Sequence, residues 1–183
     1  MELEHLNLKI PISNPEQLKP ELWNPAFQTW IQDQVCEELL IDVADYLHVP
    51  QGPGMMLIGL EADYSLDHTD GRWGLKYNRK KTLTGDNEKR LKDAFKKTLS
   101  ACERLVKDKN LKGLQFNLKE IEILINDRAL APNTAENRQN FKKELHRLLT
   151  KVLINADHEG VFEEDPKKRL GVKIKFKENI QLK

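Results

Sequence analysis

The stretch from residue 39 to residue 79 constrains the fold most, because it holds three strand-like runs separated by strong turn signals. Residues 39–47 are apolar and β-branched, and the Gly- and Pro-containing segment 50–54 then forces a loop. Residues 55–64 predict a second buried strand, and Asp70-Gly71 supplies a tight turn before a third strand at 73–79. We therefore predict a three-stranded antiparallel meander.

Two long amphipathic segments follow the meander. From Asp86 or Asn87, either of which can cap a helix, apolar residues recur at three- and four-residue steps to about residue 106. Asn133 and Glu136 form an Asx version of a capping box, and helical spacing continues behind them to about residue 154. A shorter helix at 25–36, capped by Asn24 before Pro25, precedes the meander.

Alternating apolar and polar residues predict further strands near both ends of the chain. Residues 5–10 alternate until Pro11, and 114–125 predict a hairpin or one bulged strand. In 172–176 the polar face is entirely lysine, which indicates a solvent-facing edge strand. Residues 156–170 are polar and charged, and we interpret them as a mobile loop.

This order of elements predicts an α+β fold, with a mostly antiparallel sheet and two long helices packed on one face. A length of 183 residues suits one domain over 1–183.

Charge is strongly segregated along the chain. Residues 1–72 carry 3 basic and 13 acidic side chains, whereas residues 73–112 carry 13 basic and 5 acidic ones. Such asymmetry either orients the protein toward a charged partner or reflects internal pairing, and we favour internal pairing.

The termini and cysteines bear on location. The acidic start Met1-Glu2-Leu3-Glu4 lacks the positive charge and apolar run of a secretory signal, and no apolar run approaches the length of a membrane span. Cys36 and Cys102 form no recognisable disulfide or metal framework. We expect a cytoplasmic protein with reduced thiols and no membrane insertion.

Several catalytic and nucleotide-binding signatures are absent from the sequence. It has no Walker-type loop, no Gly-x-Ser-x-Gly, no His-Glu-x-x-His and no Gly-x-Gly-x-x-Gly. No particular cofactor is therefore predicted.

The acidic meander concentrates the side chains best suited to chemistry. They are Asp42, Asp45, His48, Glu61, Asp63, Asp67, His68 and Asp70. Such a set binds a divalent metal or performs acid–base catalysis only if its members converge. Strand parity directs Asp42 and Asp45 to opposite faces, and turn residues commonly make local hydrogen bonds, so we expect structural roles and no metal.

Two flanking features complete the candidate binding surface. Gly52 and Gly54 would let backbone amides approach a ligand, although a plain turn explains them equally well. Arg72 and Arg79 lie close by in the sequence. A basic run continues beyond Arg79, but a pI near 7.7 and the lack of a recognition motif argue against nucleic acid.

The segment 41–54 carries the pattern DVADY-x-HV-x-x-GPG, and 71–80 carries GR-x-GL-x-YNRK. With these, the chain resembles a family of small bacterial proteins of unknown function. The resemblance covers about half the chain and implies a bacterial cytoplasmic origin, without a substrate or catalytic residue.

Two functions remain open at this point. The first is a non-enzymatic binding or assembly protein that presents the acidic meander 42–72 to a protein or small ligand. The second is a metal-assisted or acid–base enzyme that uses the carboxylates and imidazoles of the same region, namely Asp42, Asp45, His48, Glu61 and His68.

Overall fold

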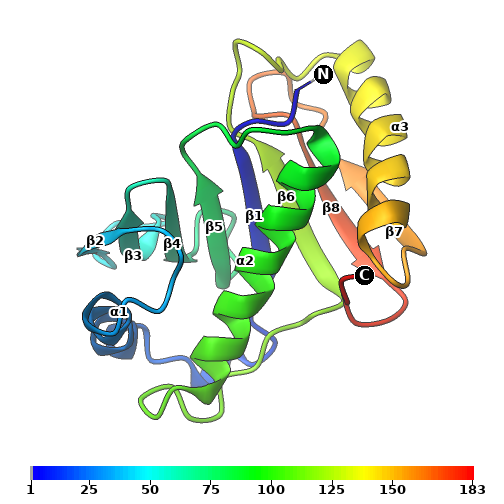
Figure 1. The fold of residues 1–183 in the computed structure, drawn as a ribbon. Coiled ribbons are helices and arrows are strands. Elements are labelled where there is room, and N and C mark those ends of the chain that lie inside the picture. Colours follow the sequence, from blue (N-terminus) through cyan, green and yellow to red (C-terminus); the bar gives the residue numbers. More distant parts are fainter. Residues whose placement is uncertain (1) are drawn as a thin grey trace.

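The computed structural model describes residues 2–183 and shows an α+β fold built on one eight-stranded sheet (Figure 1). The strand order is β2-β3-β4-β5-β1-β6-β8-β7, and every neighbouring pair is antiparallel. The strands are β1 Leu6–Pro11, β2 Leu40–Tyr46, β3 Gly54–Gly59, β4 Ala62–Asp67, β5 Gly74–Arg79, β6 Glu120–Ile125, β7 His158–Phe162 and β8 Gly171–Phe176. The predicted fold class and antiparallel sheet are confirmed.

Three α-helices accompany the sheet: α1 Trp23–Gln32, α2 Asn87–Lys107 and α3 Ala135–Val152. Helix α2 runs across β1 and β5 and contacts α3, while α1 packs at the β2 end (Figure 1). Two short 3-10 turns, Pro15–Gln17 and Pro20–Leu22, lead into α1. That both long helices pack together on one face of the sheet stays a prediction.

The core forms one continuous cluster of buried apolar side chains. Strand β1 lies in the middle of the sheet, and Leu6, Leu8 and Ile10 point into this cluster. Because successive strand residues alternate between faces, Asn7 and Lys9 point to the opposite face. We call that opposite face, which α2 does not cover, the open face.

The meander has four strands, not three. The predicted strand at 55–64 is interrupted by a tight turn after Gly59, so β3 and β4 form a hairpin. A Cβ at Gly59 would lie 2.4 Å from the carbonyl oxygen of Ala62, which shows how closely the backbone approaches itself there.

Two helix starts also differ from prediction. Helix α1 begins at Trp23 without a side-chain cap, so Asn24 is inside the helix. For α3, Thr134 accepts the capping hydrogen bond from the amide of Asn137, and Asn133 lies outside the helix. The predicted capping of α2 by Asp86 is confirmed, with the amide of Lys89 as donor.

The C-terminal part holds an additional strand. β7 lies within the predicted loop 156–170 and pairs with β8, so β7 is the edge strand and β8 lies inside the sheet. The lysine face of β8 is nevertheless exposed. Only one strand, β6, forms in 114–125, with an isolated bridge between Phe116 and Ile12 before it.

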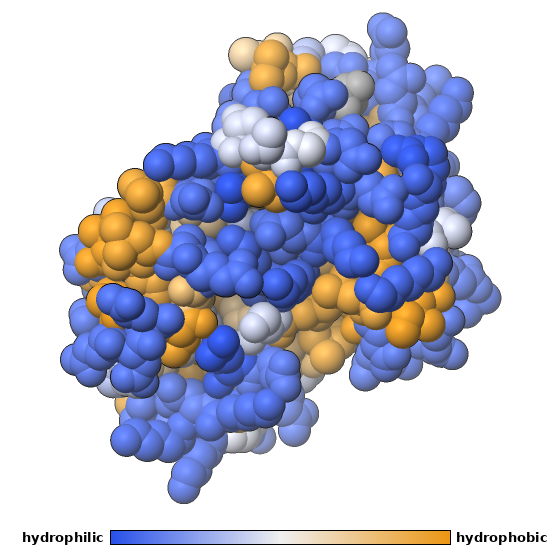
Figure 2. Space-filling view, in the orientation of Figure 1, coloured by the Kyte–Doolittle hydropathy of each residue, from blue (hydrophilic) through white to orange (hydrophobic). Residues whose placement is uncertain are grey.

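Surface hydropathy is mostly polar on the side that carries α2. Figure 2 shows an apolar patch at the end of the sheet near α1 and β2. At this end Leu39, Ile41 and Leu60 are exposed. Across residues 2–183, no helix combines the length and apolar character needed to traverse a bilayer.

Candidate functional site

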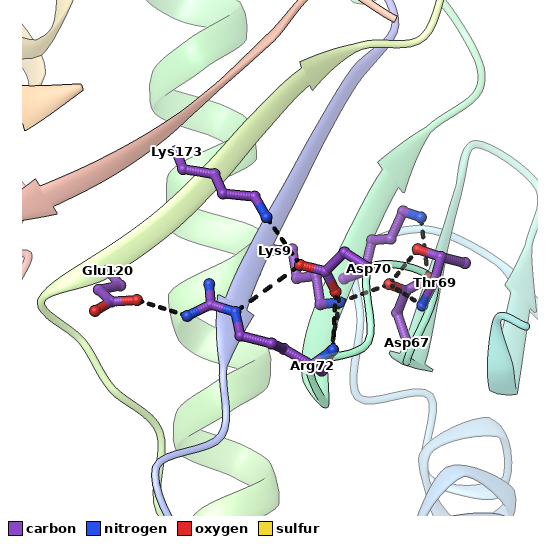
Figure 3. Close-up of polar contacts among 8 residues, drawn as sticks. Lys9, Asp67, Thr69, Asp70, Arg72, Glu120 and Lys173 are labelled. Atoms are coloured by element: carbon purple, nitrogen blue, oxygen red, sulfur yellow. Dashed lines mark hydrogen bonds and ion pairs between the residues drawn. The ribbon is translucent and has the colours of Figure 1, made fainter. Parts of the chain in front are cut away.

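Lys9 is the centre of a buried ion cluster on the open face. Its side chain is only 5% exposed, so its ammonium group must find partners within the protein. Lys9 Nζ donates to Asp67 Oδ2 at 2.8 Å, to the Arg72 carbonyl oxygen at 2.7 Å and to Asp70 Oδ1. All three ammonium protons are thereby used, and the β4–β5 turn is held down on β1 (Figure 3).

Asp67 is equally well satisfied. Its side chain is 1% exposed, and it accepts from Lys76 Nζ at 3.0 Å and from the Thr69 hydroxyl at 2.7 Å, besides Lys9. Burial alone would raise its pKa, but the charges of Lys76 and Lys9 outweigh burial and hold the pKa below its ordinary value. Asp67 is therefore an ionised structural carboxylate.

Asp70 and Arg72 extend the cluster toward β6 and β8. Burial raises the pKa of Asp70, yet the hydrogen bond and charge of Lys9, the Arg72 amide and the charge of Lys173 together outweigh burial and lower the pKa to about 2. Asp70 Oδ2 lies 3.4 Å from Lys173 Nζ, and Arg72 Nη1 donates to Glu120 Oε2 at 3.0 Å (Figure 3). The turn thus bridges five strands of the sheet.

Four charged residues stand side by side across the strands on the open face. The register pairs Lys76 with Lys9, Lys9 with Glu122, and Glu122 with Lys173. Cross-strand partners share a face. Among the described residues Glu122 makes no ion pair or hydrogen bond through its carboxylate, and burial together with the negative charge of Asp70 raises its pKa.

A groove of about 640 Å³ lies on the open face beside this cluster. Its floor comes from β5, β6 and β8 through Lys76, Glu122 and Lys173. Thr69 and Asp70 of the β4–β5 turn form one wall, and the β7–β8 loop forms the other. We call it the open-face groove.

The open-face groove is basic. Five basic side chains line it against three acidic ones; the basic ones are Lys76, Arg128, Lys168, Arg169 and Lys173. Lys168 is neutralised by Glu163 at 2.9 Å, and Lys76 and Lys173 by the aspartates of the turn. Within residues 2–183, neither Arg128 nor Arg169 has a carboxylate partner.

The predicted residues of β2 and the following loop lie away from this groove. Asp42 and Asp45 are exposed and accept hydrogen bonds from nearby backbone amides, those of Val43 at 2.7 Å and Leu47 at 2.8 Å. His48 is exposed at the loop. Asp42 and Asp45 therefore serve local structure, and none of the three residues converges with the rest of the predicted set.

Gly52 and Gly54 hold the loop against the β4–β5 turn. The amide of His68 donates to the Gly52 carbonyl at 3.3 Å, so the two segments predicted to form the binding surface are neighbours. The His68 ring stacks on Trp73 with centroids 4.3 Å apart. Gly54 has a φ of +64°, and a Cβ there would lie 2.0 Å from the Leu66 carbonyl oxygen. Both glycines have structural reasons to be there.

Glu61 and Arg79 pair on the helix side of the sheet. Arg79 Nη1 lies 3.2 Å from Glu61 Oε2, and its Nε donates to the Lys81 carbonyl at 2.6 Å. Asp63 is paired with Lys80 at 2.7 Å. In both pairs an acidic residue from 1–72 is paired with a basic residue from 73–112. Such pairs agree with the internal pairing that we favoured.

The metal reading gains no support from this geometry. In the part of the chain that the structure describes, no three His, Cys, Asp or Glu side chains are placed to hold one metal ion. Asp42 and Asp45 on β2, Glu61 at the far end of the β3–β4 hairpin and His68 beside Trp73 occupy separate places.

Comparison with known proteins adds no family. No protein-family model matches the chain, and a search of curated proteins returns no match. The resemblance to a family of small bacterial proteins stays a prediction.

Sequence reasoning missed the residues that line the open-face groove, Glu122, Arg128 and Arg169, and the cluster centre Lys9. The polar side of the first strand did contain Lys9, and a single lysine in such a strand reads as solvent-facing. Its burial follows from the turn that folds over it, 58 positions later.

Proposed function

We propose that this is a non-enzymatic binding protein whose ligand site is the open-face groove, and that its ligand carries negative charge. The acidic meander contributes one wall of this groove through Thr69 and Asp70. We therefore propose the basic groove beside the meander, and not the meander carboxylates themselves, as the ligand site.

The pair of unpartnered guanidinium groups carries this proposal. Arg169 is half-buried, and Arg128 lines the same groove. Most other charges of the cluster have counter-ions within 4 Å. A planar guanidinium suits bidentate recognition of carboxylate or phosphate, so an anion in the groove would give both arginines a counter-ion.

A native mass measurement on protein purified from its own host tests the proposal. The expected result is a mass excess from a retained small anion in wild type that is lost in the Arg128→Gln, Arg169→Gln double variant. Lys142→Gln, Lys143→Gln on the exposed side of α3 is the matched control and should retain the excess. The site would be contradicted if the double arginine variant also retained the mass excess. It would also be contradicted if that variant still captured a protein partner.

An acid–base enzyme is the second candidate, and Glu122 is the observation that favours it. It is a carboxyl at the groove floor with a raised pKa and, among residues 2–183, no ion pair. Carboxyls tuned in this way act as proton donors at active sites. If Glu122 turns over a bound anion, Glu122→Gln abolishes turnover and spares binding; if the protein only binds, the ligand leaves chemically unchanged.

We also propose a bacterial cytoplasmic setting. The family resemblance supports it, and so do the two cysteines, both of which are free thiols.

A further inference from the structure

A second hollow lies on the helix side of the sheet, far from the open-face groove. It has a volume of about 200 Å³ and sits between α2 and the segment 35–38, which joins α1 to β2. We call it the linker pocket. Gln34, with a φ of +47°, ends α1 and turns the chain so that this segment lies against α2.

The base of the linker pocket is a buried ion pair, Glu38 with Lys97, joined by the hydroxyl of Tyr64. The Glu38 side chain is 1% exposed; it accepts from the Tyr64 hydroxyl at 2.7 Å and from Lys97 Nζ at 2.8 Å. Both carboxylate oxygens are therefore satisfied, and the Glu38 charge is balanced by Lys97. Lys96 pairs with Glu37 at the rim, at 3.2 Å.

Arg104 is the cation left over in this pocket. Within residues 2–183 it has no carboxylate partner, and its charge, with that of Lys97, acts on the Cys36 thiol. The Ser100 hydroxyl, one turn earlier on α2, also lines the pocket, and no protein atom among the described residues accepts or donates a hydrogen bond to it. These groups supply donors on the α2 side.

The remaining wall is apolar. Trp30, Val35 and Ala101 line it, and the Trp30 side chain belongs to the buried core. Pockets of this kind orient a ligand by a few polar groups against an apolar body. A volume of about 200 Å³ limits the ligand to a small molecule.

We propose that the linker pocket binds a small carboxylic acid with an apolar body, its carboxylate on Arg104 and Ser100 and its apolar part against Trp30 and Val35. This inference is independent of the open-face groove. Cys36 is a wall residue, since burial raises the pKa of its thiol to about 11 and keeps it protonated at neutral pH.

An NMR titration of ¹⁵N-labelled protein with sodium benzoate tests the proposal. Benzamide is the uncharged analogue, and inorganic phosphate is an anion without an apolar body. The expected result is saturating amide shifts confined to residues 35–38 and 100–104. Arg104→Gln should weaken benzoate binding at least about tenfold, the scale of a lost charge-assisted hydrogen bond. Lys92→Gln, at another exposed cation of α2, and the Arg128→Gln, Arg169→Gln variant should leave it unchanged.

Three results would overturn the site: no saturating shifts at these residues, equal affinity for benzamide or phosphate, or full affinity in Arg104→Gln. Arg104 is exposed, so its replacement leaves the fold intact and the loss of binding interpretable.

Discussion

Lys9 and Asp67 are 58 positions apart in the chain, yet Lys9 Nζ lies 2.8 Å from Asp67 Oδ2 and both side chains are at least 95% buried. This pair ties the middle strand of the sheet to the turn that walls the open-face groove. The stability of the turn and the shape of the groove therefore depend on the same contact.

Removing the lysine should expose that dependence. Lys9→Met leaves Asp67 buried beside a single remaining cation, and breaking a buried pair costs about 3–5 kcal/mol. Urea denaturation measures the change in the free energy of unfolding. Lys175→Met is the control, because Lys175 is 74% exposed and its pair with Glu120 is worth less than about 1 kcal/mol. Equal effects of the two substitutions would contradict the structural role of Lys9.

The same cluster predicts a loss of stability in acid. The folded-state pKa values of Asp67 and Asp70 are lowered, to about 2 for Asp70. Because the folded state binds fewer protons than the unfolded state in this range, their stabilisation is present above pH 4 and is lost as the pH falls toward 2. Unfolding measured between pH 5 and 2 should show this decline, and Asp70→Asn should make it shallower. An identical slope in Asp70→Asn would contradict the assignment.

Two glycines with positive φ separate backbone strain from steric clash. Gly54 and Gly71 have φ values of +64° and +77°, but only at Gly54 would a Cβ meet another atom, the Leu66 carbonyl oxygen at 2.0 Å. Gly71→Ala should cost about 1–2 kcal/mol through the left-handed conformation alone. Gly54→Ala adds the cost of overpacking, about 1–3 kcal/mol more, and should weaken β3–β4 pairing. Thermal unfolding of both variants checks the order, and an equal loss would contradict it.

Packing of the two long helices can be tested in the core. Phe95 on α2 and Leu149 on α3 are both 0% exposed. Replacing either with Ala should destabilise the protein by about 2–5 kcal/mol. Val106→Ala, on the exposed side of α2, should cost much less. A loss below about 0.5 kcal/mol at both buried positions would mean that the helices face the other way.

Periodicity predicted the elements that bury one face and are bounded by clear signals. The apolar stripe of α2 and the aspartate before it placed that helix within a residue at either end. The alternation of apolar and polar residues in β1 and β8 likewise predicted strands, because side chains on one face of a strand recur every two residues; the polar face is exposed in β8 and buried in β1. These signals are local, and local contacts are enough to fix them.

Periodicity failed where a strand is apolar on both faces or has few apolar residues. The run 55–64 looks continuous in the sequence because β3 carries apolar side chains on both faces, and only the close backbone approach at Gly59 separates β3 from β4. β7 contains His, Glu and Gly and is recognisable only from its pairing with β8. Its place depends on a neighbour, not on its own pattern.

Sequence reasoning anticipated one contact beside the open-face groove, whereas it did not predict the residues that line the groove. The adjacency of the 48–54 loop and the 67–72 turn was inferred from the meander, and the His68–Gly52 hydrogen bond places them together. Structural roles were expected for the acidic residues, and Asp67 has one as a buried counter-ion of Lys9. Arg128 and Arg169 were not predicted, because they line one surface only where the segment after β6 and the β7–β8 loop meet in the groove.

Isothermal titration with inorganic pyrophosphate at low salt, as a small polyanion, tests the central claim that the open-face groove binds an anion. Wild type should bind pyrophosphate at one site, with affinity that falls as salt rises. The Arg128→Gln, Arg169→Gln variant should bind at least about tenfold more weakly, since each lost charge-assisted hydrogen bond contributes about 1.5–3 kcal/mol. Lys142→Gln, Lys143→Gln should bind as wild type does. An unchanged affinity in the double arginine variant, or no binding by wild type, would contradict the account.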